Sequence, residues 1–310
     1  MDPRIARWAK TLVNYCLDVK PGETVQISAT PAAEPLIFEV YRETLLAGGH
    51  PIPDVRFTGL TETLLREGND AQLQWINPAS RLLTEQVDCF LFIGSETNTR
   101  QLAGVNPERQ ALHQRAMREL FHLRQNRPAE HAARWCLTLY PTEAYAQDAD
   151  MSLGDFTEFV YEACFLNSDD PAARWRELGE RQQFYVDWLR DKKNVHIIGP
   201  QTDLRLSIAG RIFRNSDGKR NFPSGEFFTG PVEDSAQGHI HYTIPSSVNG
   251  RAVQDIHLTF KDGRVVEATA RQGQQFLDKM LELDEGARYL GEFAFGNNFG
   301  IQRPTRNILF

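Results

Sequence analysis

The chain has 310 residues, of which 41% are hydrophobic and 24% charged, and its formal net charge is −7. This composition is typical of a folded protein with a buried core and excludes a disordered chain. The negative charge argues against nucleic acid or an anionic membrane as the main partner. At about 150 residues per domain, the length predicts two domains.

The cysteines and the N-terminus indicate the compartment. Four scattered cysteines without a CxxC pair predict buried free thiols, and they argue against a disulfide framework or a zinc ribbon. The first residues lack the basic and apolar regions of a signal peptide. No apolar run approaches the ~20 residues of a membrane span. We therefore expect a cytoplasmic protein. The cysteines are Cys16, Cys89, Cys136 and Cys164.

The first part of the chain alternates strands with helices. Asp2 followed by Pro3 is typical of a helix start. A strand, a helix and a strand then follow within about 30 residues, which predicts a parallel βαβ unit. Continued alternation predicts an open α/β sheet covered by helices. Helices are predicted at 3–16, 34–47, 61–76, 107–124 and 151–165, and strands at 24–28, 53–57, 87–93 and 135–139.

A long amphipathic helix is expected to begin at Asp170-Pro171 and to close this part of the chain. Its large apolar residues recur at helical spacing, so all of them are predicted to face inward. They are Trp175, Leu178, Tyr185, Trp188 and Leu189.

The pattern changes near 191–194, after which short alternating runs and Gly/Asn/Asp turns dominate. We therefore predict an α/β domain at 1–193 and a β-rich domain at 194–310. Within the second domain, the turn at 261–263 predicts a hairpin. Strands are predicted at 196–198, 204–209, 239–244, 255–260 and 264–269, with one helix at 273–283.

Common motifs for nucleotide binding and hydrolysis are absent. The sequence contains no Walker A motif, GxSxG, HExxH or GxGxxG. A nucleotide-binding α/β protein therefore stays a minor hypothesis that rests on the first domain alone.

Two segments of the second domain each place a glycine before a glutamate and phenylalanines after it. They contain Glu226, within 221–231, and Glu292, within 291–298. An acidic side chain among aromatic residues is costly to bury unless it is paired or bound to a cation. Two such carboxylates could hold divalent metal ions. The alternative is two glutamates at the solvent ends of β-turns.

Histidines offer a competing metal site. His239 and His241 are two residues apart on a predicted strand, so they face the same way and could bind zinc. Exposed or hydrogen-bonded strand histidines are the simpler interpretation. His257 faces one side of its own strand, and nothing in the sequence links it to the other two.

The segment from Asn215 to Pro231, NSDGKRNFPSGEFFTGP, resembles the signature of the M29 metalloaminopeptidases, the thermophilic-type aminopeptidases. The resemblance extends over the whole chain without large gaps. Further matching segments are Met1-Asp2-Pro3-Arg4-Ile5, Leu12-Val13-Asn14-Tyr15, Lys20-Pro21-Gly22, Thr202-Asp203-Leu204, Gly291-Glu292-Phe293, 298–301 and 305–310.

The resemblance implies a cytoplasmic, homodimeric exopeptidase that removes N-terminal residues from peptides. It implies two divalent metal ions in the second domain, zinc or cobalt or else manganese or magnesium. Glu226 and Glu292 match metal-binding glutamates of the family. The phenylalanines around them are expected to limit the entry of water.

The chain departs from the family pattern at its end. In the family, a histidine, a catalytic tyrosine and a His-x-Asp pair follow the segment that matches 307–310. The sequence stops at Phe310 without them, so no catalytic residue is assigned here. The apolar run 308–310 is expected to be an unpaired strand end. We therefore expect a truncated second domain and an inactive chain. The alternative is a naturally short, non-catalytic homologue that binds peptides or a partner.

Overall fold

A computed structural model describes residues 2–127, 132–248, 251–307 and 309. The chain forms two compact units. The first contains the chain up to Ala172 together with Gly218–Pro223 and Leu309, and the second contains Ala173–Asp217 and the described chain from Ser224 to Asn307. The units therefore divide earlier than the expected boundary at 193, and one short segment returns to the first unit. The mixture of α/β and β-rich parts confirms the predicted fold class.

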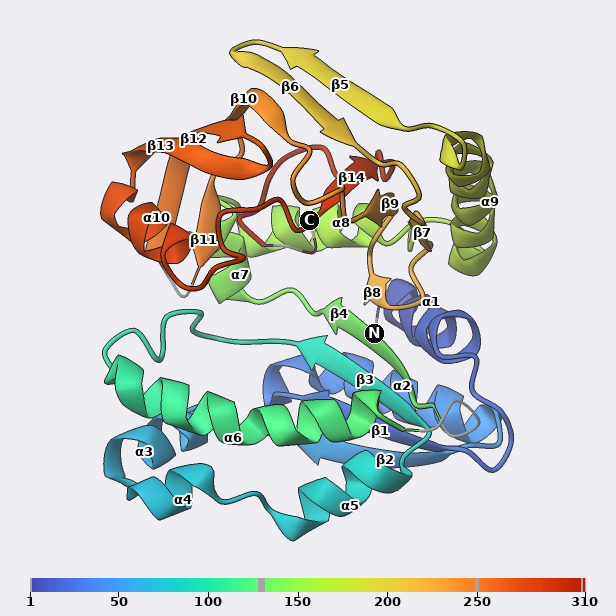
Figure 1. The fold of residues 1–310 in the computed structure, drawn as a ribbon. Helices are drawn as coiled ribbons and strands as arrows, with labels where there is room; N and C mark the ends of the chain where they lie inside the picture. Colours follow the sequence, from blue (N-terminus) through green and yellow to red (C-terminus); the bar gives the residue numbers. More distant parts are fainter. Residues whose placement is uncertain (1, 128–131, 249–250, 308, 310) are drawn as a thin grey trace. The chain divides into compact units, whose positions relative to one another are not determined.

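The first unit is built on a five-stranded parallel sheet (Figure 1). Parallel pairing runs through the whole sheet, in the order β2-β1-β3-β4-β8. Its central strands are rich in buried apolar residues, as expected of a sheet that helices cover. The strands are β1 (Thr24–Ala29), β2 (His50–Val55), β3 (Cys89–Gly94), β4 (Arg134–Leu139) and β8 (Asn221–Phe222).

Helices connect these strands. The predicted start at Asp2-Pro3 is observed, because the Asp2 side chain accepts a hydrogen bond from the Arg4 amide. The single helix expected at 61–76 is instead two helices, because Asn69 forms a capping box with Gln72. The helices are α1 (Pro3–Thr11), α2 (Glu34–Leu46), α3 (Leu60–Glu67), α4 (Asp70–Gln74), α5 (Pro78–Gln86), α6 (Pro107–Gln125), α7 (Glu143–Asp148) and α8 (Leu153–Ala163), with a π-helical turn at Leu12–Cys16 and a 3-10 turn at Pro31–Ala33.

The carboxyl ends of β1 and β3 are tied together, and it is at such a point that open α/β sheets bind ligands. Thr30 Oγ1 donates to the main-chain oxygen of Ser95 at 2.7 Å, and the Thr30 amide donates to Ser95 Oγ at 3.0 Å. Ser95 is fully buried. These contacts hold together the segments that follow β1 and β3 at this edge of the sheet.

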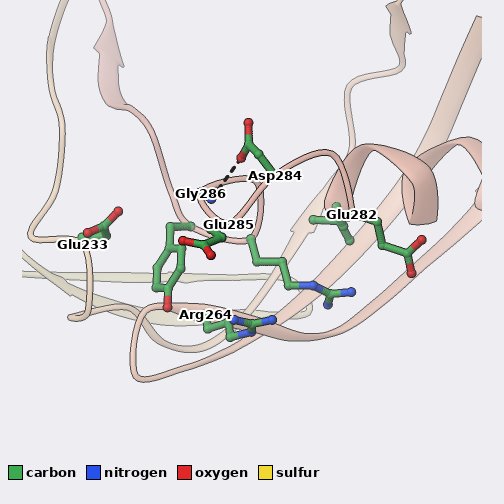
Figure 2. Close-up of a pocket in the computed structure, with 9 residues that line it drawn as sticks. Glu233, Arg264, Glu282, Asp284, Glu285 and Gly286 are labelled. Carbon is green, nitrogen blue, oxygen red and sulfur yellow. Dashed lines mark hydrogen bonds between the residues drawn. The ribbon is translucent and has the colours of Figure 1, made fainter.

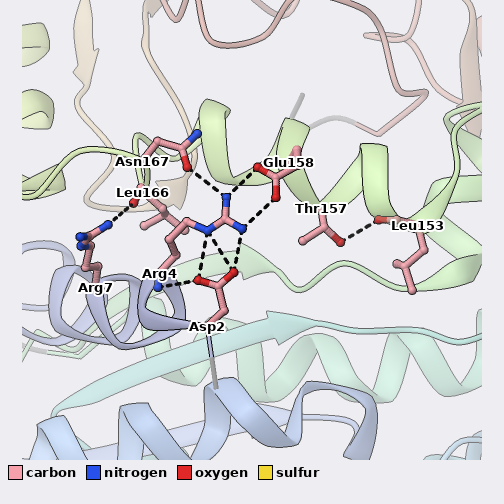
Figure 3. A network of polar contacts seen from close by, with 8 residues as sticks. All are labelled: Asp2, Arg4, Arg7, Leu153, Thr157, Glu158, Leu166 and Asn167. Carbon is pink, nitrogen blue, oxygen red and sulfur yellow. Dashed lines mark hydrogen bonds and ion pairs between the residues drawn. The ribbon is translucent and has the colours of Figure 1, made fainter.

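An ion-pair network joins α1 to α8 (Figure 3). The Arg4 guanidinium donates to Asp2 at 2.7 Å, to Glu158 at 2.6 Å and to Asn167 at 3.1 Å. It also lies 4.2 Å from the centre of the Tyr161 ring. Arg4 lowers the pKa of both carboxyl groups through these hydrogen bonds. One half-buried cation therefore fixes the start of the chain against α8.

The second unit contains two antiparallel sheets and two helices. The larger sheet has the order β11-β12-β10-β6-β5, with β13 paired to β12, and the smaller has the order β14-β9-β7. Its elements are α9 (Pro171–Leu189), which begins at the end of the first unit, β5 (Asn194–Gly199), β6 (Thr202–Ser207), β7 (Arg214–Ser216), β9 (Glu226–Thr229), β10 (Gln237–Tyr242), β11 (Ser246–Val248), β12 (Arg251–Lys261), β13 (Arg264–Gln272), α10 (Gln274–Leu281) and β14 (Phe293–Gly296).

Helix α9 buries only part of its predicted apolar face. Trp175, Leu178 and Leu189 are buried, as expected. Tyr185 and Trp188 are 43% and 58% exposed, so the inward orientation predicted for them was wrong. Tyr185 lies at the edge of the core, where it stacks on Phe227. The helix therefore contacts the small sheet along a narrower stripe than its sequence indicates.

Two further predictions concern the thiols and the end of the chain. All four cysteines are free and buried, as predicted. Burial raises the pKa of Cys89 to about 11, so this thiol is unreactive near neutral pH.

No helix within the described residues is long and apolar enough to cross a membrane. Residues 308 and 310 lie outside the described part, and Leu309 between them is a buried turn residue where a strand was expected.

Arg4→Met is expected to lower the free energy of unfolding by about 1–2 kcal/mol at pH 7, because charged hydrogen bonds are lost while the apolar stem stays packed. Solvent weakens the share of Glu158, whose side chain is 60% exposed. Since the folded protein lowers both carboxyl pKa values, the loss should shrink as the pH falls through about 4. Urea unfolding at pH 7 and pH 3 measures this difference.

The matched control is Arg42→Met, whose exposed guanidinium pairs with Glu39 alone at 3.3 Å among the described residues, and its loss should cost under about 1 kcal/mol. Equal losses for the two variants would contradict the role assigned to Arg4.

Candidate metal site on the small sheet of the second unit

The pairing of β9 with β14 brings the two Gly-Glu segments together. Gly296 pairs with Glu226 and Ala294 with Phe228. Paired residues of an antiparallel sheet point to the same face, and side chains alternate along each strand. Glu292, just before β14, therefore falls on the face of Glu226. The small neighbours Ala294, Gly296 and Gly230 leave that face open.

The phenylalanines occupy the opposite face of the same strands. Phe227 is buried, and its ring stacks on Phe295 at 4.9 Å between centroids. Phe213 packs against both of these rings, and Phe293 packs edge-on against Phe295. The aromatic cluster is thus a partly buried layer beneath the strands, in which Phe213 and Phe227 are buried and Phe295 is 36% exposed. The resemblance implied that the phenylalanines would limit the entry of water to the carboxylates. The cluster instead lies on the other face of the strands, and Phe228 is the one phenylalanine of β9 and β14 on the carboxylate face.

Glu226 is the perturbed group of this face. Its pKa is raised mainly by burial and in addition by the negative charge of Glu292. Among the described residues, the Glu226 side chain has neither a hydrogen-bond nor an ion-pair partner, while Glu292 is exposed. A half-buried carboxylate that faces a second carboxylate without a cation is unfavourable. The arrangement therefore suits a bound cation.

Gly225 sets the direction of the chain before Glu226. Its φ is +107°, a backbone conformation that side chains rarely adopt. A Cβ atom there would lie 2.6 Å from Cβ of Asn298. The Gly225 carbonyl accepts from the Asn297 amide at 2.6 Å, and Asn298 Nδ2 donates to the Ser224 carbonyl at 3.0 Å. Only glycine permits this approach, so the first Gly-Glu motif has a structural cause.

Gly291, in the second motif, differs. A Cβ atom built on it meets nothing within 4 Å, and its φ is not positive. The two motifs therefore look alike in sequence but place different demands on the backbone.

The ligand chemistry fits a divalent cation in part. Carboxylate oxygens bind hard and borderline divalent ions. Across the described residues, however, no three His, Cys, Asp or Glu side chains come together as a ligand set. The predicted ligands Glu226 and Glu292 therefore gain no third His, Cys, Asp or Glu partner among the described residues.

The candidate histidines form no metal site with these glutamates. His241 stacks on His257 at 4.0 Å, with the rings nearly parallel, and its Nε2 lies 3.2 Å from Asp255. The expectation that nothing links His257 to the others was therefore wrong, because His241 and His257 pair across β10 and β12. His239 pairs instead with Asp203 of β6. The hydrogen-bonded interpretation of His241 is the one observed.

The second unit also has a cavity of about 860 Å³ (Figure 2). Two of its lining residues, Glu233 and Tyr289, come from the segments that follow β9 and precede β14. Glu233 follows Gly230 by three residues, and Tyr289 precedes Glu292 by three. Neither Glu226 nor Glu292 lines this cavity. Its wall is strongly charged, with acidic and basic groups intermixed. The lining residues are Glu233, Arg264, Leu281, Glu282, Asp284, Glu285, Gly286, Arg288 and Tyr289.

One buried polar residue near Glu226, Gln182, was not predicted from the sequence. Gln182 of α9 is fully buried, and its amide contacts the main chain of Glu226. A signal was present, because Gln182 stands seven residues after Trp175 and seven before Leu189, which are both buried. A polar residue at an inward helical position indicates a specific buried contact.

Comparisons with known proteins agree on one family. A family model described as thermophilic metalloprotease (M29) matches residues 1–310. Aminopeptidase 2 of Geobacillus stearothermophilus is 29% identical over 93% of this chain and 76% of its own length. Aminopeptidase T of Thermus thermophilus is 25% identical over 94% of this chain and 76% of its own. These matches confirm the predicted resemblance.

Solved structures support the fold. Wild-type AmpT from Thermus thermophilus superposes with a TM-score of 0.82 at 21% identity, over 95% of this chain and 78% of that one. A 2,5-dihydroxypyridine dioxygenase from Pseudomonas putida gives a TM-score of 0.54 at 12% identity, over 94% and 76%. Because its name describes another reaction, the fold alone does not decide the chemistry.

Gly225→Ala is expected to destabilise the protein by about 2–4 kcal/mol, because the alanine is strained at positive φ and its Cβ overlaps Asn298. Gly291→Ala, in the other Gly-Glu motif, meets open space and should change stability by less than about 0.5 kcal/mol. Urea unfolding of both variants gives the comparison. Similar losses for the two alanines would show that the close approach at Gly225 is not decisive.

Proposed function

Because the chain belongs to the M29 family of thermophilic metalloproteases, we propose that it is a metal-dependent aminopeptidase whose metal site includes Glu226 and Glu292. The observation that carries this proposal is the half-buried, unpartnered Glu226 carboxylate facing Glu292. The names of the relatives support the aminopeptidase assignment and peptide substrates. A metal ion is the cofactor that the family description implies.

The two carboxylates have two tasks in this proposal. They hold the metal, for which zinc, cobalt, manganese and magnesium are the candidates, and their negative charge attracts the free α-amine of a peptide. When bound, a pair of divalent ions supplies a water molecule of lowered pKa and polarises the scissile carbonyl. The open side of the small sheet, with Ala294 and Gly296, leaves space for the peptide. We also propose the cytoplasmic location and the homodimer that the resemblance implies.

A second function has one observation in its favour. No group of three His, Cys, Asp or Glu side chains that could hold a metal ion occurs among the described residues, so the two proposed glutamate ligands have no third partner there. A protein with this ligand set could bind peptides or a partner without cleaving them. The same observation supports the expectation that the 310-residue chain by itself binds metal weakly and has little activity.

Hydrolysis of a leucine anilide distinguishes the two functions. For the aminopeptidase we expect slow turnover that requires added metal, stops with a chelator and is absent for an N-acetylated substrate, since the carboxylates recognise the free amine. The measurement is anilide release by residues 1–310, together with metal analysis of the same sample. Peptide binding without any turnover would favour the non-catalytic homologue, and rapid turnover would contradict the expected weak activity.

Glu226→Gln separates metal binding from folding. The folded protein raises the pKa of Glu226, so the protonated carboxyl favours folding and its ionisation opposes folding. The stabilising contribution of the protonated form is therefore complete below about pH 4 and is lost as the pH rises. Without metal, the variant should therefore be at least as stable as wild type at pH 8 and equal to it at pH 4. Thermal unfolding at both pH values measures this.

With metal, the order should reverse. A ligand at ten times its Kd stabilises the folded state by about 1.4 kcal/mol, and Glu226→Gln should lose this gain. The exposed Glu180→Gln, on α9, should behave as wild type throughout. A variant that is less stable without metal at pH 8, or one that metal still stabilises fully, would remove Glu226 from the proposed site.

A further inference from the structure

A buried amide lies beneath the strand that carries Glu226. Gln182 is fully buried, and its Nε2 donates to the main-chain oxygen of Glu226 at 3.2 Å. The same nitrogen lies 3.3 Å from the main-chain oxygen of Ser216 and 2.7 Å from Oδ1 of Asn215. Ser216 and Glu226 pair across β7 and β9. One side chain therefore holds both strands at the level of Glu226.

A second amide anchors this contact to the helix. Asn215 Nδ2 donates to the main-chain oxygen of Gly179 at 2.8 Å and to Oε1 of Gln183 at 3.2 Å. Together, Gln182 and Asn215 join one turn of α9 to the ends of β7 and β9. Because main-chain atoms are the acceptors on Ser216 and Glu226, these contacts fix the backbone and leave the Glu226 carboxylate free to face Glu292.

The Gln182 side chain makes hydrogen bonds through its N–H donors and none through its carbonyl oxygen among the described residues. Oε1 of Gln182 is buried and has no hydrogen-bond partner among the described residues. A buried carbonyl without a partner is unfavourable, whereas an apolar side chain of similar volume would fill the space without that cost. A glutamine at this position is therefore useful for its donors and unfavourable for its acceptor.

From these contacts we propose that Gln182 is a positioning residue for the metal site, one that acts through Glu226. This rests on the function proposed above. Gln182 holds the start of β9 so that the Glu226 side chain stays half-buried beside Glu292. Groups that hydrogen-bond a metal-binding side chain orient it, and their loss weakens metal affinity by about 10–100-fold. Gln182 acts through the main chain of Glu226, so we expect an effect at the lower end of that range.

Gln182→Met tests the role, because it keeps the side-chain volume and removes both donors. We expect the affinity for Mn²⁺, measured from free Mn²⁺ by EPR, to fall by about tenfold. Without metal, the midpoint of thermal unfolding should fall only slightly, because loss of the unpaired Gln182 carbonyl offsets part of the cost of leaving Asn215 Oδ1 without its donor. Gln237→Met is the matched control, because this exposed side chain bonds only Asp262 within the described residues. It should leave both quantities unchanged.

Unchanged Mn²⁺ affinity in Gln182→Met would overturn the inference. A fall in affinity with an equal fall in metal-free stability would also do so, because it would indicate a purely structural contact. If the wild-type chain binds no Mn²⁺, the proposed metal site fails first. Amide hydrogen exchange then decides the positioning role: Gln182→Met should speed exchange in β9 relative to β12, and equal protection would refute it.

Discussion

A carboxylate that is half removed from water, with no cation beside it, is the constraint on which the second unit depends. Such a group opposes folding unless something offsets it, and both burial and the charge of Glu292 raise the pKa of Glu226. The surrounding structure keeps it there all the same. Gly225 turns the chain toward Asn298, β14 brings Glu292 to the same face, and a layer of phenylalanine rings supports both strands from behind. The stability lost at Glu226 is thus offset by packing on the opposite face.

The two faces of the small sheet β14-β9-β7 therefore have different roles. The aromatic face contributes burial and rigidity, while the other face carries charge and small residues. In a strand this separation needs only alternation, so Glu226 and Phe227 can serve opposite purposes although they are adjacent. Precision at such a site depends on the groups that hold the strands in place. Here these groups come from α9, which contributes one amide from inside the core and an aromatic ring at its edge.

Much of this arrangement can be read from the sequence, because it depends on local signals. The helix start at Asp2-Pro3, the parallel βαβ unit and the two Gly-Glu segments all follow from neighbouring residues. Contacts between distant segments could not be read in the same way. The stacking of His241 on His257 depends on the register of β10 with β12, and the exposure of Tyr185 and Trp188 depends on how much of α9 the small sheet can cover. Gln182 was not predicted at all: its spacing from Trp175 and Leu189 is that of an inward residue, but the strand it contacts depends on tertiary packing.

The path of the chain between the two units has a consequence of its own. After entering the second unit at Ala173, the chain returns to add β8 to the edge of the first sheet, beside β4, and then leaves again. The first unit is therefore not a continuous piece of sequence. A fragment that ended at Ala172 would lack β8 and leave the main-chain groups at the end of β4 unpaired, and such open edges attract other strands. During synthesis, the sheet of the first unit is therefore completed only after residues 173–217 of the second unit have been made.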